Sequence, residues 1–361
     1  MIDKAYEKAK EVIKACSTPY GLFASGGVDG YDAIWARDSM ITSLGASLEE
    51  DFRIVIKKSI ITLAANQSKN GQIPNAVDKF SSRKPHVDFQ SIDSTLWYLI
   101  GHYLYKKRYN DASLLRKFRK SIEKAITWLE CQDIGENGLL AQLPTTDWQD
   151  AFPHKFGYTI NTQALYCKVL KLLNQDTIRL KHMVNDDKDT KLWNGNFYVP
   201  YRWKNHNKYK EIGDWFDSLG NLMAIVFDLA PKPKAQKILS YIEKKRINKP
   251  FPVKAIFPPI KKGNKNWHDY FSDCDAKDPW SYANGGIWTF IGGFYVLALI
   301  KLKRFRKAEQ ELQKLAEANL KGNFPEWIHP MTKENFGSLQ AWNAGLYILA
   351  VNSFRNKKVL L

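Results

Sequence analysis

Two carboxyl groups in this sequence stand beside tryptophan, a setting that suits acid–base chemistry. Asp147 precedes Trp148 in TTDWQD, and Glu326 lies between Pro325 and Trp327 in FPEWIHP. A carboxyl packed on an indole ring is poorly hydrated, which raises its pKa and keeps a proton available near neutral pH. One protonated carboxyl and one ionised partner across a cleft can act together as general acid and general base.

The reaction that such a pair supports is hydrolysis of a glycosidic bond, which uses two carboxyl groups on either side of the bond. The two acids are far apart in the sequence, so the fold must bring their loops together. The structural alternative is that each acid caps a helix or pairs with a cation such as Arg37 or His154. Spacing alone leaves both interpretations open.

The elements that must position these acids are helices of two alternating kinds. Amphipathic helices rich in Lys and Glu are predicted near 2–16, 50–66, 113–131, 174–185, 232–246 and 304–319. Helices that are apolar nearly all round are predicted near 38–48, 91–106, 158–173, 216–229, 284–301 and 338–353. Amphipathic helices belong at the surface and all-round apolar helices inside. The pattern therefore predicts an all-α fold, an (α/α)6 toroid in which residues 1–361 form a single domain; the alternative is an open α-solenoid.

The loops before the predicted inner helices hold the unusual polar residues. They cover residues 26–40, 84–97, 142–165, 213–221, 278–288 and 324–342, and each combines an acid with aromatic residues. The connections after the inner helices are plain charged or proline-containing turns. In a toroid every inner helix starts on the same face, so these six loops are expected to converge on one funnel.

Composition limits the partners that the chain is expected to bind. The formal net charge is +17, but Lys and Arg are mixed with Glu in the amphipathic segments, as on a solvated helix face. We therefore expect no nucleic-acid partner, although a salt-dependent shift with duplex DNA would show one. The apolar run 285–300 is shorter than the roughly 20 residues of a membrane span, so a buried helix and no membrane partner are predicted.

The cysteine pattern and the N-terminus predict a cytoplasmic protein. The four cysteines have no CxxC pair and no histidine at ligand spacing, which indicates reduced thiols and no metal site; they are Cys16, Cys131, Cys167 and Cys274. The charged segment 1–16 lacks the apolar core of a signal peptide. No organic cofactor is expected either, because there is no phosphate-binding loop.

Six segments, in order, carry a family resemblance: YDAIWARDSM, IDSTLW, TTDWQDAFPHKFGYTINTQALY, NGGIW, FPEW and LQAW. They resemble the (α/α)6 glycoside hydrolases that include alkaline/neutral invertases, the glucosidase domain of glycogen debranching enzymes and glucoamylase-like proteins. The resemblance implies an inverting mechanism with Asp147 as acid and Glu326 as base. It implies α-glucosidic substrates: sucrose, an α-1,6-linked glucan branch or a short α-glucoside.

The same resemblance implies a set of sugar-binding residues. Those at matching positions, with the aromatic residues of the same segments, are Tyr31, Trp35, Arg37, Asp38, Asp93, Trp97, Gln163, Asn284, Trp288, Gln340 and Trp342. As an alternative, Asp38 and Asp93 are helix N-caps, since Asp is favoured there. The chain departs from the invertases at Tyr282, where a histidine would precede the NGG turn, and no added β-domain is expected.

Two other functions stay open at this point. A sugar epimerase on the same toroid would use paired histidines, and the loops offer His86, His154 and His329. A non-catalytic glycan-binding toroid would keep the tryptophans and Arg37 without needing both acids. Oligomeric state has no signal in the sequence.

Overall fold

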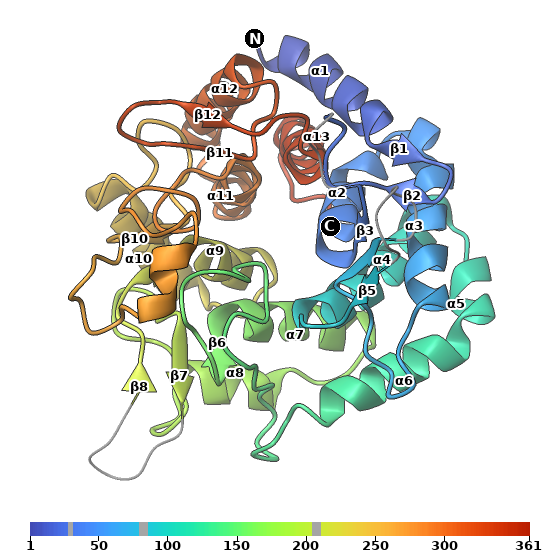
Figure 1. The fold of residues 1–361 in the computed structure, drawn as a ribbon, viewed down its shortest axis with the longest axis horizontal. Helices are drawn as coiled ribbons and strands as arrows, with labels where there is room; N and C mark the ends of the chain where they lie inside the picture. The colour runs from blue at the N-terminus through green and yellow to red at the C-terminus, as the bar shows by residue number, and fades with distance from the viewer. Residues whose placement is uncertain (28–31, 79–85, 204–210) are drawn as a thin grey trace.

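Paired helices form a closed ring (Figure 1), and the computed structural model describes residues 1–27, 32–78, 86–203 and 211–361. The inner helices are α2 (Ala36–Ala46), α4 (Asp93–Tyr109), α7 (Ile160–Leu172), α9 (Ser218–Val226), α11 (Thr289–Lys301) and α13 (Ala341–Arg355). Each inner helix contacts the next one, and α13 contacts α2. The ring is therefore closed, which confirms the predicted toroid and excludes the open solenoid.

An outer layer of amphipathic helices surrounds this ring. It consists of α1 (Ile2–Ala15), α3 (Arg53–Ala65), α5 (Ser113–Lys117), α6 (Arg119–Glu130), α8 (Ile178–Asn185), α10 (Lys232–Lys244) and α12 (Phe305–Lys321). Most helix boundaries differ from the prediction by a few residues, and two differences in the outer layer have a visible cause or break a helix. The predicted helix 113–131 is interrupted at Phe118, and α8 starts only at Ile178 because Asn174, with φ of 56°, turns the chain after α7.

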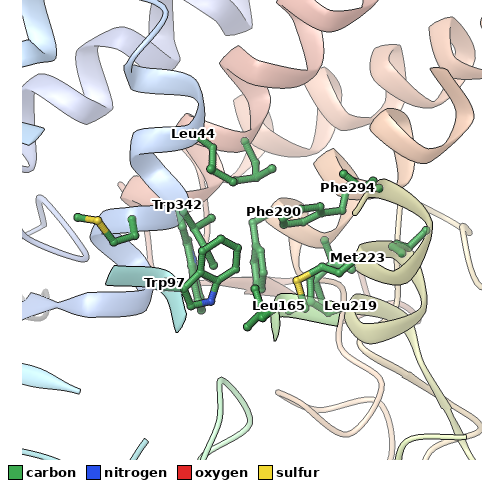
Figure 2. Packing of buried hydrophobic residues seen from close by; sticks show 14 of the residues in the cluster. Leu44, Trp97, Leu165, Leu219, Met223, Phe290, Phe294 and Trp342 are labelled. Atoms are coloured by element: carbon green, nitrogen blue, oxygen red, sulfur yellow. The ribbon is translucent and has the colours of Figure 1, made fainter. Parts of the chain in front are cut away.

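The hydrophobic core lies where the inner helices meet (Figure 2). Each of them contributes buried side chains, for example Leu44 from α2, Trp97 from α4, Leu165 from α7, Met223 from α9, Phe294 from α11 and Trp342 from α13. The apolar run 285–300 mostly forms α11, whose residues from Thr289 to Ile300 are all buried. Within the described residues, no helix combines the length and the hydropathy of a membrane span.

Short antiparallel strands fix the loops at one end of the ring. They are β1 (Ser17–Thr18) with β2 (Gly21–Leu22); β3 (Ile34–Trp35), β4 (Ala76–Asp78) and β5 (His86–Asp88); β6 (Tyr158–Thr159), β7 (Tyr201–Trp203) and β8 (Glu211–Ile212); β9 (Phe216–Asp217) with β10 (Ile256–Phe257); and β11 (Trp327–Ile328) with β12 (Asn335–Phe336). Strands β3, β6 and β9 run directly into α2, α7 and α9. These pairings fix the positions at which α2, α7 and α9 begin and orient their first residues.

Candidate active site

A cavity of about 240 Å³ lies among the loops that precede the inner helices. The described residues that line it are Ala24, Trp35, Arg37, Asp38, Trp148, Asp150, Tyr282, Trp288, Glu326, Gln340 and Trp342. They come from the segments before or at the start of α2, α7, α11 and α13. The ring thus brings together residues that are more than 300 positions apart, as the alternation of helices predicts.

The cavity holds some of the predicted site residues and adds others. Those that the sequence predicts and the cavity contains are Trp35, Arg37, Asp38, Trp288, Glu326, Gln340 and Trp342. Asp150 and Trp148 are additional; both lie in the TTDWQD segment, from which sequence reasoning selected the first acid and not the second. Tyr31 lies outside the described residues.

Asp147, predicted to face Glu326 across a cleft, lies away from this cavity. It is fully buried, and its Oδ2 is 2.9 Å from Lys155 Nζ. Its Oδ1 accepts a hydrogen bond from the backbone N–H of Gln149 at 3.0 Å, and Gln142 donates Nε2 to Oδ2 at 3.3 Å. The carboxylate is therefore held in an internal ion pair. This matches the structural alternative, in which the acid pairs with a cation, but the cation is Lys155 and not Arg37 or His154.

Lys155 joins the two ends of the segment 147–155 through its ion pair with Asp147, and it connects the segment to α9 through its ion pair with Asp217. It is fully buried, and its Nζ contacts Asp147 Oδ2, Asp217 Oδ2 at 3.0 Å and Gln149 Oε1 at 2.6 Å. Asp217 in turn caps α9, since its Oδ1 accepts from Gly220 N–H at 3.0 Å. Burial acts to lower the pKa of Lys155, but the two carboxylates raise it above the ordinary value. The loop that carries Asp150 is thus anchored on a charged lysine.

Asp150 lies between those anchors and reaches the cavity. Its side chain is 41% exposed and lines the cavity, where the surrounding protein atoms reduce its hydration. The resulting loss of hydration raises the pKa of Asp150, against the opposing effect of Arg37, whose Nη2 lies 3.5 Å from Asp150 Oδ2. A carboxyl with a raised pKa that opens to a cavity meets the requirement for a general acid.

Arg37 stands at the centre of three carboxyl groups. Its Nε is 3.7 Å from Asp38 Oδ2, its Nη1 is 3.5 Å from Asp93 Oδ1, and its Nη2 approaches Asp150. Burial lowers the pKa of Arg37, but these carboxylates raise it overall. Burial also raises the pKa of Asp38, to about 6, and raises that of Asp93. The arginine therefore stays charged and fixes the positions of the acids around it.

The N-cap alternative for Asp38 and Asp93 does not match their positions. The N-cap residue of α2 is Trp35 and that of α4 is Ile92, so both acids lie within the first helical turn. Asp38 lines the cavity, whereas Asp93 is 2% exposed and supports Arg37 from behind. Asp93 is thus a positioning residue in this structure, and its side chain does not line the cavity.

Several polar atoms around the cavity have no hydrogen-bond partner within the described part of the chain. They are Arg37 Nε and Nη1, Asp38 Oδ2, Trp148 Nε1 and Trp342 Nε1, all buried. Buried polar atoms are nearly always hydrogen-bonded in native proteins. A ligand rich in hydroxyl groups would supply both donors and acceptors to this set.

The aromatic walls of the cavity are packed edge to face. The rings of Trp148 and Trp288 are 5.6 Å apart at 80°, and those of Trp288 and Trp342 are 5.7 Å apart at 83°. Trp288 also donates Nε1 to the backbone oxygen of Tyr282 at 3.2 Å. These contacts hold the indoles rigidly and leave flat apolar faces of the kind on which sugar rings stack.

A hairpin of β11 and β12 positions Glu326. The backbone N–H of Glu326 donates to Phe336 O at 2.8 Å, and the rings of Trp327 and Phe336 are stacked 3.9 Å apart at 3°. Asn343 of α13 donates Nδ2 to the backbone oxygen of Pro325. The aromatic residues around Glu326 therefore stabilise the loop, while the carboxyl itself lines the cavity.

Three other predicted binding residues have structural roles. Gln163 exchanges two hydrogen bonds with the backbone of Leu140, at 2.7 and 3.2 Å. Asn284 likewise exchanges two with the backbone of Ile260, at 2.8 and 2.7 Å. Trp97 is 1% exposed within the core. None of the three is among the described residues that line the cavity, because their polar or aromatic groups are used to hold loops and helices together.

Solved glycosidases share this fold. The GH63 mannosylglycerate hydrolase from Thermus thermophilus, in complex with Tris and D-glycerate, has a TM-score of 0.71 over 95% of this chain and 99% of that chain, at 13% identity. A glycosidase variant in complex with glucose has a TM-score of 0.66 over 98% of each chain, at 14% identity. At these identities the likeness shows the fold alone, which is the (α/α)6 toroid of glycoside hydrolases.

Two family models match successive parts of the sequence. The model described as amylo-alpha-1,6-glucosidase matches residues 7–204, and the one described as alkaline and neutral invertase matches residues 210–356. Because the first match spans more than half of the chain, the protein belongs to the amylo-alpha-1,6-glucosidase family of glycoside hydrolases. The resemblance inferred from six short segments is confirmed.

Curated relatives match over a limited stretch. The chain is 30% identical over 139 residues to neutral/alkaline invertase 1, mitochondrial, of Oryza sativa, and 32% identical over 144 residues to probable alkaline/neutral invertase D of Arabidopsis thaliana. The matched stretch covers 37% and 38% of this chain but only 22% and 26% of those relatives. Relatives named mitochondrial, chloroplastic and cytosolic all occur, so the cytoplasmic location stays a prediction.

Proposed function

We propose that this protein is an inverting glycoside hydrolase that cleaves an α-glucosidic bond, with Asp150 as general acid and Glu326 as general base. The observation that carries this proposal is that both carboxyl groups line the same cavity. Asp150 replaces Asp147 in the acid role, because Asp147 is fully buried in an ion pair with Lys155. The base is the one expected from the FPEW segment.

In the proposed reaction each carboxyl has one task. Asp150 donates its proton to the leaving oxygen, which its raised pKa favours. Glu326 takes a proton from a water molecule that attacks the opposite face of the sugar. In inverting enzymes the two carboxyl groups are about 6.5–9.5 Å apart, which leaves room for that water.

The size and chemistry of the cavity favour a single terminal sugar unit. Its volume of about 240 Å³ is below the range of roughly 300–1,000 Å³ typical of pockets for drug-sized ligands. Arg37 and Asp38 would bind sugar hydroxyls, and the indoles of Trp35, Trp288 and Trp342 would pack on the apolar faces of the ring. Gln340 completes the polar lining.

Three substrate classes agree with the comparisons. The family descriptions name an invertase and an amylo-alpha-1,6-glucosidase, and two structural neighbours were solved with glucose. Together with the resemblance of the six segments, they support sucrose, an α-1,6-linked glucan branch and a short α-glucoside as candidates. The epimerase alternative has less support, because no histidine is among the described residues that line the cavity.

The direct test follows the anomer that is released first. Purified protein is incubated with sucrose, isomaltose, maltose and limit dextrin, and the products are followed by NMR before mutarotation. We expect one substrate to release β-glucose from its α-linkage. Release of α-glucose would contradict the inverting mechanism, and no release from any of them would contradict the α-glucosidic specificity.

Gly337 gives a test of how closely Glu326 must be positioned. Gly337 has φ of 63°, and an added Cβ would lie 2.9 Å from Glu326 Cβ and 3.4 Å from its Oε2. We expect Gly337→Ala to lower kcat by up to about 100-fold through displacement of the carboxyl. The matched control is Gly195→Ala, where φ is 105° but nothing lies within 4 Å of the added atom. Equal kcat in the two variants would show that Glu326 tolerates the shift.

A further inference from the structure

A second cavity of about 490 Å³ borders the residues that precede Asp150 in the chain. It is bounded by the residues after β5, by α6 and the residues that follow it, by the segment 141–146, and by β7 with the residues before β6. Four aromatic side chains line it: Phe89, Trp128, Phe156 and Trp203. Four glutamines line it as well, and no charged residue is among its described lining residues.

We propose that this cavity is a second carbohydrate-binding site, which holds a neutral glucan segment remote from the bond being cut. This inference rests on the proposed function, since it assigns the distant part of the same substrate. It also narrows the substrate class, because sucrose has no distant part and an oligomeric or branched glucan does.

The absence of charge among the described lining residues points to a neutral ligand. The chain carries 54 basic and 37 acidic residues, a net charge of +17, so a cavity of this size whose described lining holds no charged residue differs from the overall composition. A site for a phosphorylated or acidic ligand would use some of those cations. Aromatic faces together with amides, which both donate and accept hydrogen bonds, instead match the apolar faces and hydroxyl groups of a pyranose ring.

The aromatic platforms are held in place by neighbouring groups. Gly157 has φ of 69°, and a Cβ there would lie 2.4 Å from Trp203 Cε3, so the indole packs directly on the Gly157 backbone. Phe156 lies beside it, with ring centres 6.2 Å apart. Just after α6, Gln132 donates Nε2 to Trp128 O at 3.0 Å, which fixes the amide next to the second indole. Rigid platforms lose little entropy when they bind a ligand.

The exposed rim extends the apolar surface of the cavity. Leu143 and Ile134 both line the cavity and are 73% and 63% exposed. Large aliphatic side chains this exposed are few in the described part of the chain. Their position at the mouth fits a chain that enters from solvent and continues across the surface.

A continuous segment joins this cavity to the candidate active site. Gln142 lines the second cavity, and its backbone N–H and O both pair with Gly157, at 3.0 and 2.8 Å. Its Nε2 donates to Asp147 Oδ2, and the chain then runs through Trp148 to Asp150 in the first cavity. The segment 142–150 therefore lines the second cavity with its first residues and the candidate active site with its last, as expected if the two cavities bind two parts of one ligand.

The test compares substrates of different length. In Trp128→Ala and Trp203→Ala, we expect KM for an α-glucan of seven or more units to rise about tenfold, with kcat and the constants for a disaccharide unchanged. The matched control is Trp193→Ala, because Trp193 packs against Tyr198 and Lys234 and lines neither cavity. Gln132→Glu, at a half-buried position just after α6, adds a charge without removing an aromatic ring and should have the same effect.

Binding measurements separate this inference from the proposed function. Calorimetry with Glu326→Gln and maltoheptaose or an isomalto-oligosaccharide measures affinity without turnover. A loss of affinity when Trp128→Ala is added supports the second site even if the wild-type protein hydrolyses nothing. Unchanged affinity and KM in folded Trp128→Ala, Trp203→Ala and Gln132→Glu would overturn the second site. The second site would also be overturned if these variants lost binding of an apolar dye but still bound the oligosaccharide as the parent protein does.

Discussion

Asp150→Asn is expected to lower kcat by about 10²- to 10⁴-fold while sugar affinity changes little. The reason is that asparagine keeps the shape of the side chain but cannot donate a proton to the leaving oxygen, and general acid catalysis contributes a factor of that size. Glu326→Gln is expected to lose turnover to a similar degree. Steady-state kinetics on the substrate found by NMR, with calorimetric binding of the product sugar, measure both quantities.

Asp147→Asn is the control that distinguishes the two acids of the TTDWQD segment. Asp147 contacts Lys155 and does not line the cavity, so this variant should be less stable but should keep most of its kcat when folded. If instead Asp147→Asn loses turnover and Asp150→Asn does not, the acid assignment is wrong. A protein that keeps sugar affinity and shows no turnover in any form would be the glycan-binding alternative.

The pH profile gives a second measure of the same assignment. Asp150 must be protonated to act as an acid, and burial raises its pKa above that of an ordinary aspartate. Activity should therefore fall as pH rises through this raised pKa, because the proton is lost. That alkaline limb should be absent from the residual activity of Asp150→Asn on a substrate whose leaving group needs no protonation.

Lys155→Met is expected to destabilise the fold by about 3–5 kcal/mol, the cost of breaking a buried ion pair from one side. Methionine fills a similar volume but leaves the carboxylates of Asp147 and Asp217 buried without their cation. The free energy of unfolding, from urea titration followed by circular dichroism, measures this cost. Because the same lysine anchors the loop of Asp150, kcat of the folded fraction should fall as well.

A surface lysine supplies the comparison for this variant. Lys265 is 67% exposed and pairs with Asp214 at 2.8 Å, so Lys265→Met should cost about 0–1 kcal/mol. If Lys155→Met costs no more than Lys265→Met, the buried pairs do not stabilise the loop. Adding Asp147→Asn to Lys155→Met should recover part of the loss, since one unpaired charge is then removed.

The family of the chain and part of its candidate site could be predicted from sequence because both follow from local patterns. The alternation of amphipathic and apolar helices shows which helices are buried. Apolar helices must form the inner layer and amphipathic helices the outer layer. Once six inner helices start on one face, the FPEW and WARDS segments must meet, so Glu326, Arg37 and Asp38 line one cavity. Gln163 and Asn284 do not, because a buried amide that binds backbone has the same sequence signature as one that binds sugar.

The sequence by itself determined the closed helical ring, the face on which its loops gather and the segments that meet there. Only the tertiary structure decided which acid of the TTDWQD segment reaches the cavity. Asp147 is buried in an ion pair with Lys155, whose ammonium group also contacts Asp217, 62 residues after the lysine. Hydrophobic periodicity depends on near neighbours, whereas the direction of a charged side chain in a loop depends on partners that only the folded chain brings close.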